Sequence, residues 1–269
     1  MGKFDGVLIC SDMDNTLALH GGNYYDLKFC PRDVEEIRYF QREGGRFTVI
    51  SGRYPDKLRK LMTEIVPNAP IGGYNGALLQ NADGTLFYEG GSEQTEMIRV
   101  AQCLWENHRE IEAIGVHVSG HKILRCNRSV WESDMYQDPL AMLRDMPFRT
   151  YNVVVAGKPG EGERICRLVE QALDDSMVYT RPYESTVEFS LREDTKGAAL
   201  LRIKKEVGAK LAVAVGDYEN DIEMLRAADI GYAVENACEA LHAVADRTAP
   251  ACGKGAIAAI VAELETRDL

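Results

Sequence analysis

Three short apolar runs, each followed closely by polar residues, constrain the fold of this chain more than any other feature of its sequence. The runs cover residues 7–10, 47–50 and 211–215. Runs of this length are typical of buried strands in a parallel sheet. In an open α/β sheet, ligands bind beyond the carboxyl ends of the strands, so residues far apart in the sequence can meet in one pocket. The sequence therefore predicts an α/β fold with a polar site at one edge of a parallel sheet.

Two carboxylates separated by one residue follow the first run, in the segment Asp12-Met13-Asp14-Asn15-Thr16. One carboxylate can attack phosphorus to form an acyl-phosphate, and its neighbour can protonate the leaving oxygen and then deprotonate water. Taken alone, the segment is more often an acidic turn or a helix N-cap, because Asp and Asn are common turn residues.

A second acidic segment follows the third run. Asp217, Asn220 and Asp221 supply hard oxygen ligands, which suit Mg²⁺. Such a metal would offset the repulsion between a carboxylate nucleophile and a phosphate dianion, and it would orient the phosphoryl group for in-line attack. The alternative is that Gly216-Asp217 forms a turn into a helix, with Asp217 or Asn220 capping it.

Lys196 and Ser51 are candidate partners for a phosphoryl group. Lys196 follows Thr195, a candidate N-cap, and opens an apparent helix. The helix macrodipole disfavours a cation in the first turn, so this placement favours an anionic partner. Ser51 could donate its hydroxyl to a phosphoryl oxygen. Each residue alone also fits an ordinary position, as a surface Lys or as a small residue that closes a strand.

These residues belong to four polar segments, which are 12–16, Ser51-Gly52-Arg53, Thr195-Lys196-Gly197 and 216–221. The four segments occur together and in order, and in this combination the chain resembles the haloacid dehalogenase superfamily. The resemblance implies that Asp12 is the nucleophile and Asp14 the general acid/base. It also implies that Ser51 and Lys196 bind the phosphoryl group and that Asp217 is the principal metal ligand. The full ligand set expected for Mg²⁺ is Asp12, Asp14, Asp217 and Asp221.

Within this superfamily the chain is similar to the Cof-type group with a type IIB cap. The similarity rests on a large insertion between Ser51 and Lys196 and on the segment Tyr74-Asn75-Gly76-Ala77. One departure is Asn15, where these proteins usually carry Gly. Asn tolerates left-handed backbone angles, so the loop can keep its shape. The residues expected to bind substrate are Asn15, Gly52, Arg53, Asn75 and Asn220.

The order of elements predicts a discontinuous Rossmann-like core and one inserted domain. Residues 1–85 and 188–269 alternate strands with helices, which is a βαβ pattern. Residues 86–187 instead contain strands joined by tight turns, with helical segments at 93–108, 131–143 and 163–173. This arrangement predicts an α+β cap domain whose mainly antiparallel sheet is covered by helices on one face.

Polar residues outside the four segments have several interpretations. His117 and His121 are four residues apart, but Ser119-Gly120 breaks any helix between them and no Cys or carboxylate cluster completes a zinc set. Asn236 and Lys254 lie where the phosphatases that this chain resembles keep polar residues after the metal segment, but they are interpreted first as a helix cap and a solvated side chain. Residues 113–118 and 123–126 are predicted to form a hairpin around Ser119-Gly120. Its polar residues could contact the substrate or be ordinary cap surface; they are His117, His121, Lys122 and Arg125.

Composition limits the class of partner. The 269-residue chain has a formal charge of −11, which opposes attraction to nucleic acid or to anionic membranes. Its apolar runs are far shorter than the roughly 20 residues needed to span a bilayer. The seven cysteines show no C-x-x-C spacing, as expected for reduced thiols in the cytoplasm. The expected partner is a small phosphorylated metabolite, and the sequence indicates no oligomeric state.

Three functions fit these residues. The leading interpretation is a Mg²⁺-dependent phosphatase that hydrolyses a small phosphomonoester, such as a sugar phosphate, through an aspartyl-phosphate intermediate. A phosphomutase would use the same intermediate but return the phosphoryl group to its substrate. A non-catalytic ligand-binding or regulatory protein on the same fold is disfavoured because every catalytic group is present.

Overall fold

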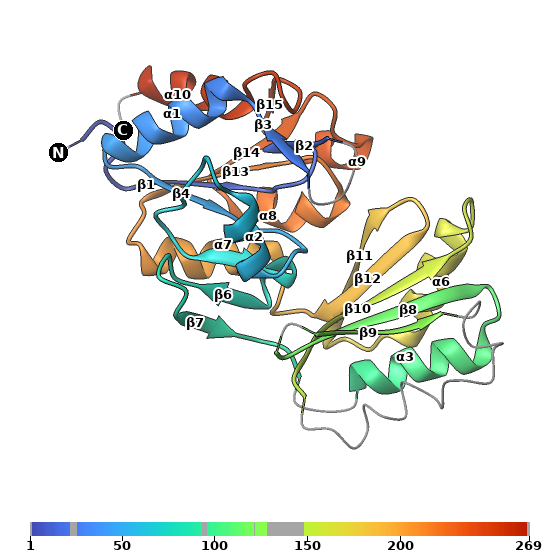
Figure 1. Cartoon of the computed structure of the whole chain (residues 1–269). Helices are drawn as coiled ribbons and strands as arrows, with labels where there is room; N and C mark the ends of the chain where they lie inside the picture. Colours follow the sequence, from blue (N-terminus) through green and yellow to red (C-terminus); the bar gives the residue numbers. More distant parts are fainter. Residues whose placement is uncertain (1, 22–25, 93–95, 121, 128–147, 268–269) are drawn as a thin grey trace. The chain divides into compact units, whose positions relative to one another are not determined.

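The computed structural model describes residues 2–21, 26–92, 96–120, 122–127 and 148–267 (Figure 1). The chain forms two compact units. The parallel-sheet unit combines Met1–Glu89 with Thr195–Leu269, and the antiparallel-sheet unit is Gly90–Asp194. No helix within the described ranges is long and apolar enough to cross a membrane.

The parallel-sheet unit is built on five parallel strands in the order β15-β14-β13-β1-β4. Their bounds are β1 Val7–Ser11, β4 Arg46–Val49, β13 Leu211–Gly216, β14 Ile230–Val234 and β15 Arg247–Ala249. β1 pairs with β13 on one side and with the edge strand β4 on the other, which places Ser11 opposite both Val215 and Val49. The three apolar runs are therefore neighbouring strands that end at the same edge of the sheet.

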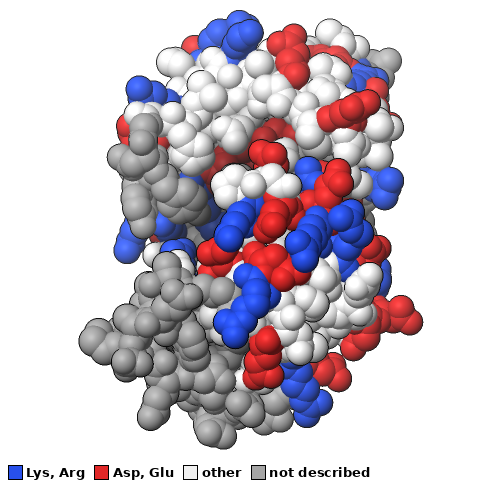
Figure 2. Space-filling model, turned by 90° about the vertical axis from the view of Figure 1, so that its right-hand side faces the viewer, with Lys and Arg blue, Asp and Glu red and all other residues white. Residues whose placement is uncertain are grey.

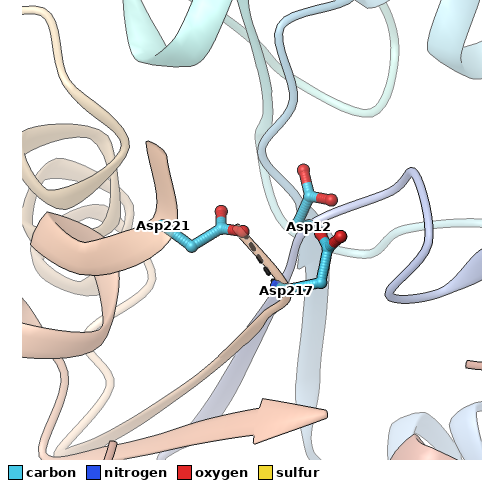
Figure 3. Close-up of side chains that lie close together, drawn as sticks. All are labelled: Asp12, Asp217 and Asp221. Atoms are coloured by element: carbon cyan, nitrogen blue, oxygen red, sulfur yellow. Dashed lines mark hydrogen bonds between the residues drawn. The ribbon is translucent and has the colours of Figure 1, made fainter. Parts of the chain in front are cut away.

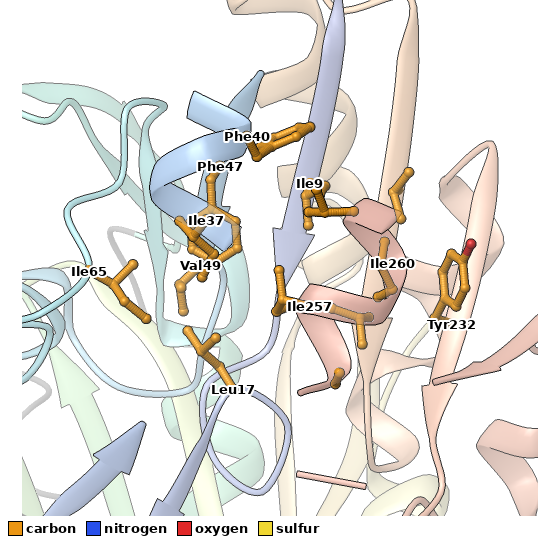
Figure 4. Packing of buried hydrophobic residues seen from close by; sticks show 14 of the residues in the cluster. Ile9, Leu17, Ile37, Phe40, Phe47, Val49, Ile65, Tyr232, Ile257 and Ile260 are labelled. Atoms are coloured by element: carbon orange, nitrogen blue, oxygen red, sulfur yellow. The ribbon is translucent and has the colours of Figure 1, made fainter. Parts of the chain in front are cut away.

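Helices cover both faces of this sheet. α1 (Pro31–Arg42) and α10 (Ala256–Glu265) pack on one face, and α7 (Lys196–Glu206) and α8 (Ile222–Ala227) pack on the other. Successive strand residues point to opposite faces, so Ile9 packs with α1 and α10 (Figure 4), whereas Leu8 packs with α7 and α8. Burial on both faces explains why these strands are continuous apolar runs.

Smaller elements complete the parallel-sheet unit. β2 (Ala18–His20) and β3 (Leu27–Phe29) form an antiparallel hairpin, and β5 (Ile71–Gly73), β6 (Leu78–Gln80) and β7 (Leu86–Glu89) form a second antiparallel sheet. The short helices are α2 (Pro55–Leu61), α9 (Glu239–His242) and the 3-10 turns η1 (Tyr74–Gly76) and η2 (Glu219–Asp221). The two 3-10 turns carry three predicted site residues, Asn75, Asn220 and Asp221.

The antiparallel-sheet unit contains five antiparallel strands in the order β11-β12-β10-β8-β9. Their bounds are β8 Ile111–Val118, β9 Lys122–Asn127, β10 Thr150–Gly157, β11 Met177–Tyr183 and β12 Thr186–Leu191. α3 (Glu96–Asn107) and α6 (Gly162–Ala172) pack against the face that carries Val116 and Val153. His117, Asn152 and Glu188 alternate with such apolar residues and lie on the opposite face.

The predicted fold class, a Rossmann-like parallel sheet with an inserted α+β part, is confirmed. The boundaries differ from the predicted 86–187, because the second unit begins at Gly90 and ends at Asp194. β7 pairs with β6 in the parallel-sheet unit, and β12 pairs with β10 in the other unit. The strand that each one pairs with decides the unit it joins. The helix predicted at 131–143 lies outside the described residues, as do residues 93–95 at the start of the predicted helix 93–108.

Candidate active site

Three buried carboxylates meet at the carboxyl ends of β1 and β13. Asp12 directly follows β1, and its amide donates to the carbonyl oxygen of Val215 at 2.9 Å, which continues the strand pairing. Asp217 directly follows β13, and Asp221 closes η2 one turn later. Figure 3 shows that the three side chains converge, and one oxygen of each lies within 4.8 Å of the others.

Lys196 is the cation of this group. It is the first residue of α7, whose N-cap Thr195 accepts a hydrogen bond from the Ala198 amide at 3.3 Å. Its Nζ donates to Asp12 Oδ1 and to Asp221 Oδ1, each at 2.6 Å, and its side chain is fully buried. The sequence predicts an anionic partner for this Lys, and the structure places it between two.

Asp221 is held from the other side by backbone amides. Its Oδ2 accepts from the Asp217 amide at 3.0 Å and the Tyr218 amide at 3.2 Å. Gly216 makes this approach possible, because a Cβ there would lie only 2.5 Å from the Asp221 side chain. The segment Gly216–Asp221 therefore wraps around one carboxylate, which fixes its orientation.

The crowded charges shift the acid–base equilibria of the group. Burial raises the pKa of Asp12 to about 7, with a further increase from the charges of Asp221 and Asp14 and an opposing effect of Lys196. Burial, Asp12 and Asp221 raise the pKa of Asp217 to about 8. Burial alone would lower the pKa of Lys196, but attraction to Asp12 and Asp221 leaves it raised. Burial is thus the main cause of both raised carboxylate pKa values, and Lys196 only partly opposes it.

Asp14 does not join the three carboxylates. Its Oδ2 accepts from Arg53 Nε at 2.8 Å and its Oδ1 from Arg53 Nη2 at 2.6 Å, while His20 Nε2 lies 3.0 Å from Oδ1. Three of the four expected metal ligands, Asp12, Asp217 and Asp221, come together, while the Asp14 carboxylate pairs with Arg53. The physical reason is the paired attraction of the Arg53 guanidinium, which draws the Asp14 carboxylate to itself.

Ser51 and Asn75 belong to one hydrogen-bonded loop system. The Ser51 amide donates to the Gly72 carbonyl at 3.0 Å, and the Asn75 amide donates to the Ser51 carbonyl at 2.9 Å. Asn75 has a left-handed backbone with φ 55°, and its Oδ1 accepts from Asn220 Nδ2 at 3.5 Å. A Cβ on Gly52 would be 3.6 Å from Asn75 Oδ1. These predicted substrate-binding residues therefore contact one another.

Gly76 fixes this loop against α7. It has φ 107°, and a Cβ there would lie 2.5 Å from the carbonyl oxygen of Thr195. Only glycine permits both the angle and the contact. The segment that carries Asn75 is therefore packed against the residue that precedes Lys196.

Asn15 and Asn236 show how the nucleophile loop is held. Asn15 has φ 61°, the left-handed conformation that the sequence predicts it can adopt. Asn236 Nδ2 donates to the Asn15 carbonyl at 2.9 Å, and Asn236 Oδ1 accepts from the Cys252 amide at 2.7 Å. The interpretation of Asn236 as a helix cap is wrong, because α9 has Cys238 at its N-cap. Lys254 is exposed, as predicted.

Two further contacts were not foreseen from the sequence. Thr16 Oγ1 donates to Asp217 Oδ1 at 3.1 Å, so the end of the first segment braces the predicted metal ligand. His20 reaches Asp14 from β2, although no spacing in the sequence connects the two. Thr16 could have been suspected from its place in the first segment, whereas His20 gives no sequence signal.

The antiparallel-sheet unit has a separate buried polar chain. Asn152 Nδ2 donates to Glu188 Oε1, and Asn152 Oδ1 is in hydrogen-bond contact with His117 Nδ1. Burial lowers the pKa of His117, Arg125 lowers it further, and Asn152 opposes the change. Of the predicted hairpin residues, His121 and the Lys122 side chain lie outside what the structure describes. The interpretation that hairpin residues contact the substrate can therefore be followed only at His117 and Arg125. Asn152 links His117 to Glu188 on the same face of the sheet.

Comparison with known proteins adds to this geometry. A sequence model of the haloacid dehalogenase-like hydrolases matches residues 9–261. Phosphatase YwpJ of Bacillus subtilis is 25% identical over 271 residues, which cover 89% of this chain and 93% of that protein. Phosphoglycolate phosphatase 2 of Saccharolobus solfataricus is 24% identical over 241 residues, or 89% and 84%. The solved structure of the subclass IIB sugar phosphatase BT4131 has a TM-score of 0.73 at 19% identity, over 95% of this chain and 98% of that chain.

The family match and the geometry coincide. The matched residues contain all four polar segments, and they include the whole of the antiparallel-sheet unit. The likeness in fold to BT4131 also extends over both units. This chain therefore belongs to the haloacid dehalogenase-like hydrolases, as its four segments predict.

Proposed function

We propose that the protein is a Mg²⁺-dependent phosphatase that hydrolyses a small phosphomonoester through a phosphorylated Asp12. The observation that carries the proposal is the buried group of Asp12, Asp217 and Asp221, in which Lys196 pairs with Asp12 and Asp221. The phosphatase names of relatives with 24% and 25% identity support the reaction class. Membership of a hydrolase family sets aside the non-catalytic alternative.

The donor set fits Mg²⁺. When all three carboxylates are ionised, they and the Lys196 ammonium together carry a net charge of −2, and burial raises the pKa of Asp12 and of Asp217. Hard oxygen donors without sulfur or imidazole suit Mg²⁺ rather than a softer metal. Asp12 and Asp217 would hold the ion, with Asp221 beside them. When bound, it would neutralise negative charge and fix the position of the phosphoryl oxygens.

The residues support a reaction in two displacement steps. In the first step an Asp12 carboxylate oxygen attacks phosphorus, the bond from phosphorus to the leaving oxygen breaks, and the proton of Asp14 passes to that oxygen. In the second step water attacks phosphorus, its proton passes to Asp14, and the bond from phosphorus to Asp12 breaks. The products are an alcohol and inorganic phosphate.

Lys196 and Ser51 would bind the phosphoryl group during both steps. Lys196 Nζ is 2.6 Å from Asp12 Oδ1, so it is close to any group attached to that carboxylate. Ser51 is buried in the loop that follows β4, its Oγ accepts from the Arg53 amide at 3.2 Å, and a hydroxyl that accepts can also donate its own hydrogen. Such preorganised donors stabilise charge that develops in the transition state.

The partner is proposed to be a small phosphorylated metabolite. A net charge of −11, and acidic and basic side chains interspersed on the described part of the face in Figure 2, give little attraction for nucleic acid. Buried thiols at Cys10, Cys30 and Cys252 support a location in the reducing cytoplasm.

We expect the protein to release inorganic phosphate from a panel of phosphomonoesters in the presence of Mg²⁺. The panel should include sugar phosphates, phosphoglycolate and an aryl phosphate, with products identified by NMR. Release of phosphate with an equal amount of free alcohol supports a phosphatase. Accumulation of an isomeric phosphate ester without free phosphate would instead identify a phosphomutase and contradict the proposal.

We propose that the antiparallel-sheet unit acts as the cap, which selects the leaving group. The change to make is Asn152→Ala, because Asn152 is buried and joins His117 to Glu188. A lost buried polar contact costs about 1–3 kcal/mol, so we expect kcat/KM for the best ester to fall about 10-fold or more. Turnover of a phosphomonoester with a much smaller leaving group should change far less.

Glu163→Gln provides the matched control for this experiment. Glu163 is exposed on α6, which packs on the opposite face of the same sheet. It should leave the substrate profile unchanged. A uniform loss over the panel in Asn152→Ala, with normal thermal stability, would contradict a role of this face in selecting substrate.

A further inference from the structure

Arg53 lies close to the proposed chemistry but faces Asp14. The guanidinium donates two hydrogen bonds, from Nε at 2.8 Å and from Nη2 at 2.6 Å, one to each oxygen of the Asp14 carboxylate. Only 1% of the Arg53 side chain is exposed, compared with 19% of the Asp14 side chain. Two parallel hydrogen bonds fix both the place and the plane of a carboxylate.

The backbone around Arg53 is anchored to the rest of the site. Its amide donates to Ser51 Oγ at 3.2 Å, and its carbonyl accepts from the Tyr74 amide at 3.0 Å. The guanidinium is therefore attached to the same loop as a proposed phosphoryl ligand. The loop therefore holds Ser51 and the guanidinium that pairs with Asp14 close together.

The second partner of Asp14 is more loosely held. His20 Nε2 lies 3.0 Å from Oδ1, and 30% of the His20 side chain is exposed. An exposed partner that shares an oxygen with a bidentate Arg contributes little to the orientation of the carboxylate. Arg53 is therefore the group that determines where the Asp14 carboxylate points.

We infer that Arg53 is a positioning residue for Asp14 and acts on the reaction through it, rather than as the substrate ligand that the sequence predicts. The inference rests on the proposed function, in which Asp14 exchanges a proton with the leaving oxygen and then with water. Asp14 Oδ2 accepts from Arg53 Nε with one lone pair and has a second lone pair, whereas Oδ1 lies close to both Arg53 and His20. The pair thus leaves Asp14 able to exchange a proton while restricting its direction.

Arg53→Ala should lower kcat about 100-fold, the low end of the range for general acid–base catalysis, with KM changed by less than about threefold. Guanidinium ion added to the assay should restore part of the lost kcat, because it can occupy the vacated space and pair with Asp14. Arg53→Lys keeps the positive charge but cannot donate two parallel hydrogen bonds, so its kcat should lie between those of wild type and Arg53→Ala. His20→Ala is the control and should lower kcat by less than about fivefold.

A double-mutant cycle with Asp14→Asn gives the sharpest result. If Arg53 acts through Asp14, adding Arg53→Ala to Asp14→Asn should cause no further loss of kcat, since interacting residues are not additive. The inference would be overturned if the loss of kcat in the double variant equalled the product of the two single losses, or if Arg53→Ala raised KM strongly. Arg53 would then be a substrate ligand, as the sequence predicts. If the proposed function itself is wrong, wild type releases no phosphate and Asp12→Asn changes nothing, which is a separate outcome.

Discussion

Asp12→Asn is expected to lower kcat by at least about 10⁴-fold, the scale seen when other covalent nucleophiles are removed. The amide oxygen of Asn does not form the acyl-phosphate on which both proposed steps depend. Asn has nearly the same shape as Asp, so the position beside Lys196 and Val215 remains filled. The measurement is phosphate release by the purified variant against the best ester of the panel.

The stability of the same variant provides the control. Since burial raises the pKa of Asp12 to about 7, native Asp12 binds its proton more tightly than the unfolded chain does. The resulting stability is present at low pH and is lost as the pH rises from the unfolded pKa of about 4 through about 7. Above that pH a neutral amide should not lower the melting temperature. Retention of more than a tenth of wild-type activity would contradict the role of Asp12.

Removal of divalent metal is expected to abolish activity, and Mg²⁺ is expected to restore it. Asp12, Asp217 and Asp221 repel one another and repel a phosphate dianion, and Lys196 alone does not balance them. Asp217→Ala should therefore require much more Mg²⁺ for half-maximal activity. Asp174→Ala removes an exposed carboxylate in the antiparallel-sheet unit and should need no more Mg²⁺ for half-maximal activity than wild type.

Thermal unfolding separates metal binding from activity. A ligand that binds only the folded state stabilises it by about 2.7 kcal/mol at a concentration of 100 times its Kd. Mg²⁺ should therefore raise the melting temperature of the wild type and of Asp174→Ala, and raise that of Asp217→Ala much less. Full activity after exhaustive chelation, with no metal found by elemental analysis, would contradict the proposed metal dependence.

The sequence was sufficient to predict the framework of the site. Strands buried on both faces appear as continuous apolar runs, so β1, β4 and β13 can be recognised without a structure. Parallel strands end at a common edge, which makes the meeting of Asp12 with Asp217 predictable as well. The place of Lys196 in the first turn of a helix favours an anionic partner, but its role follows only from the four segments together.

The details that the sequence left open depend on tertiary contacts. The predicted roles of Asp14 and Arg53 took no account of their pairing, because 39 positions separate them and no periodicity links them. Asn236 has the composition of a helix cap, but it bonds across to Asn15, 221 positions away. The unit boundaries shifted because β7 and β12 join the sheets in which they find partners. Such choices arise from packing between segments, which local patterns do not encode.

Detection of a phosphoryl group on Asp12 tests the central claim most directly. The wild-type enzyme, mixed with its best ester and Mg²⁺ and quenched with acid within one turnover, should be digested and analysed by mass spectrometry. The account predicts that the peptide containing Asp12 gains the mass of one phosphoryl group, and that Asp12→Asn shows no such gain. Continued turnover with no phosphorylated Asp12 at any quench time, or with the phosphoryl group on another residue, would contradict it.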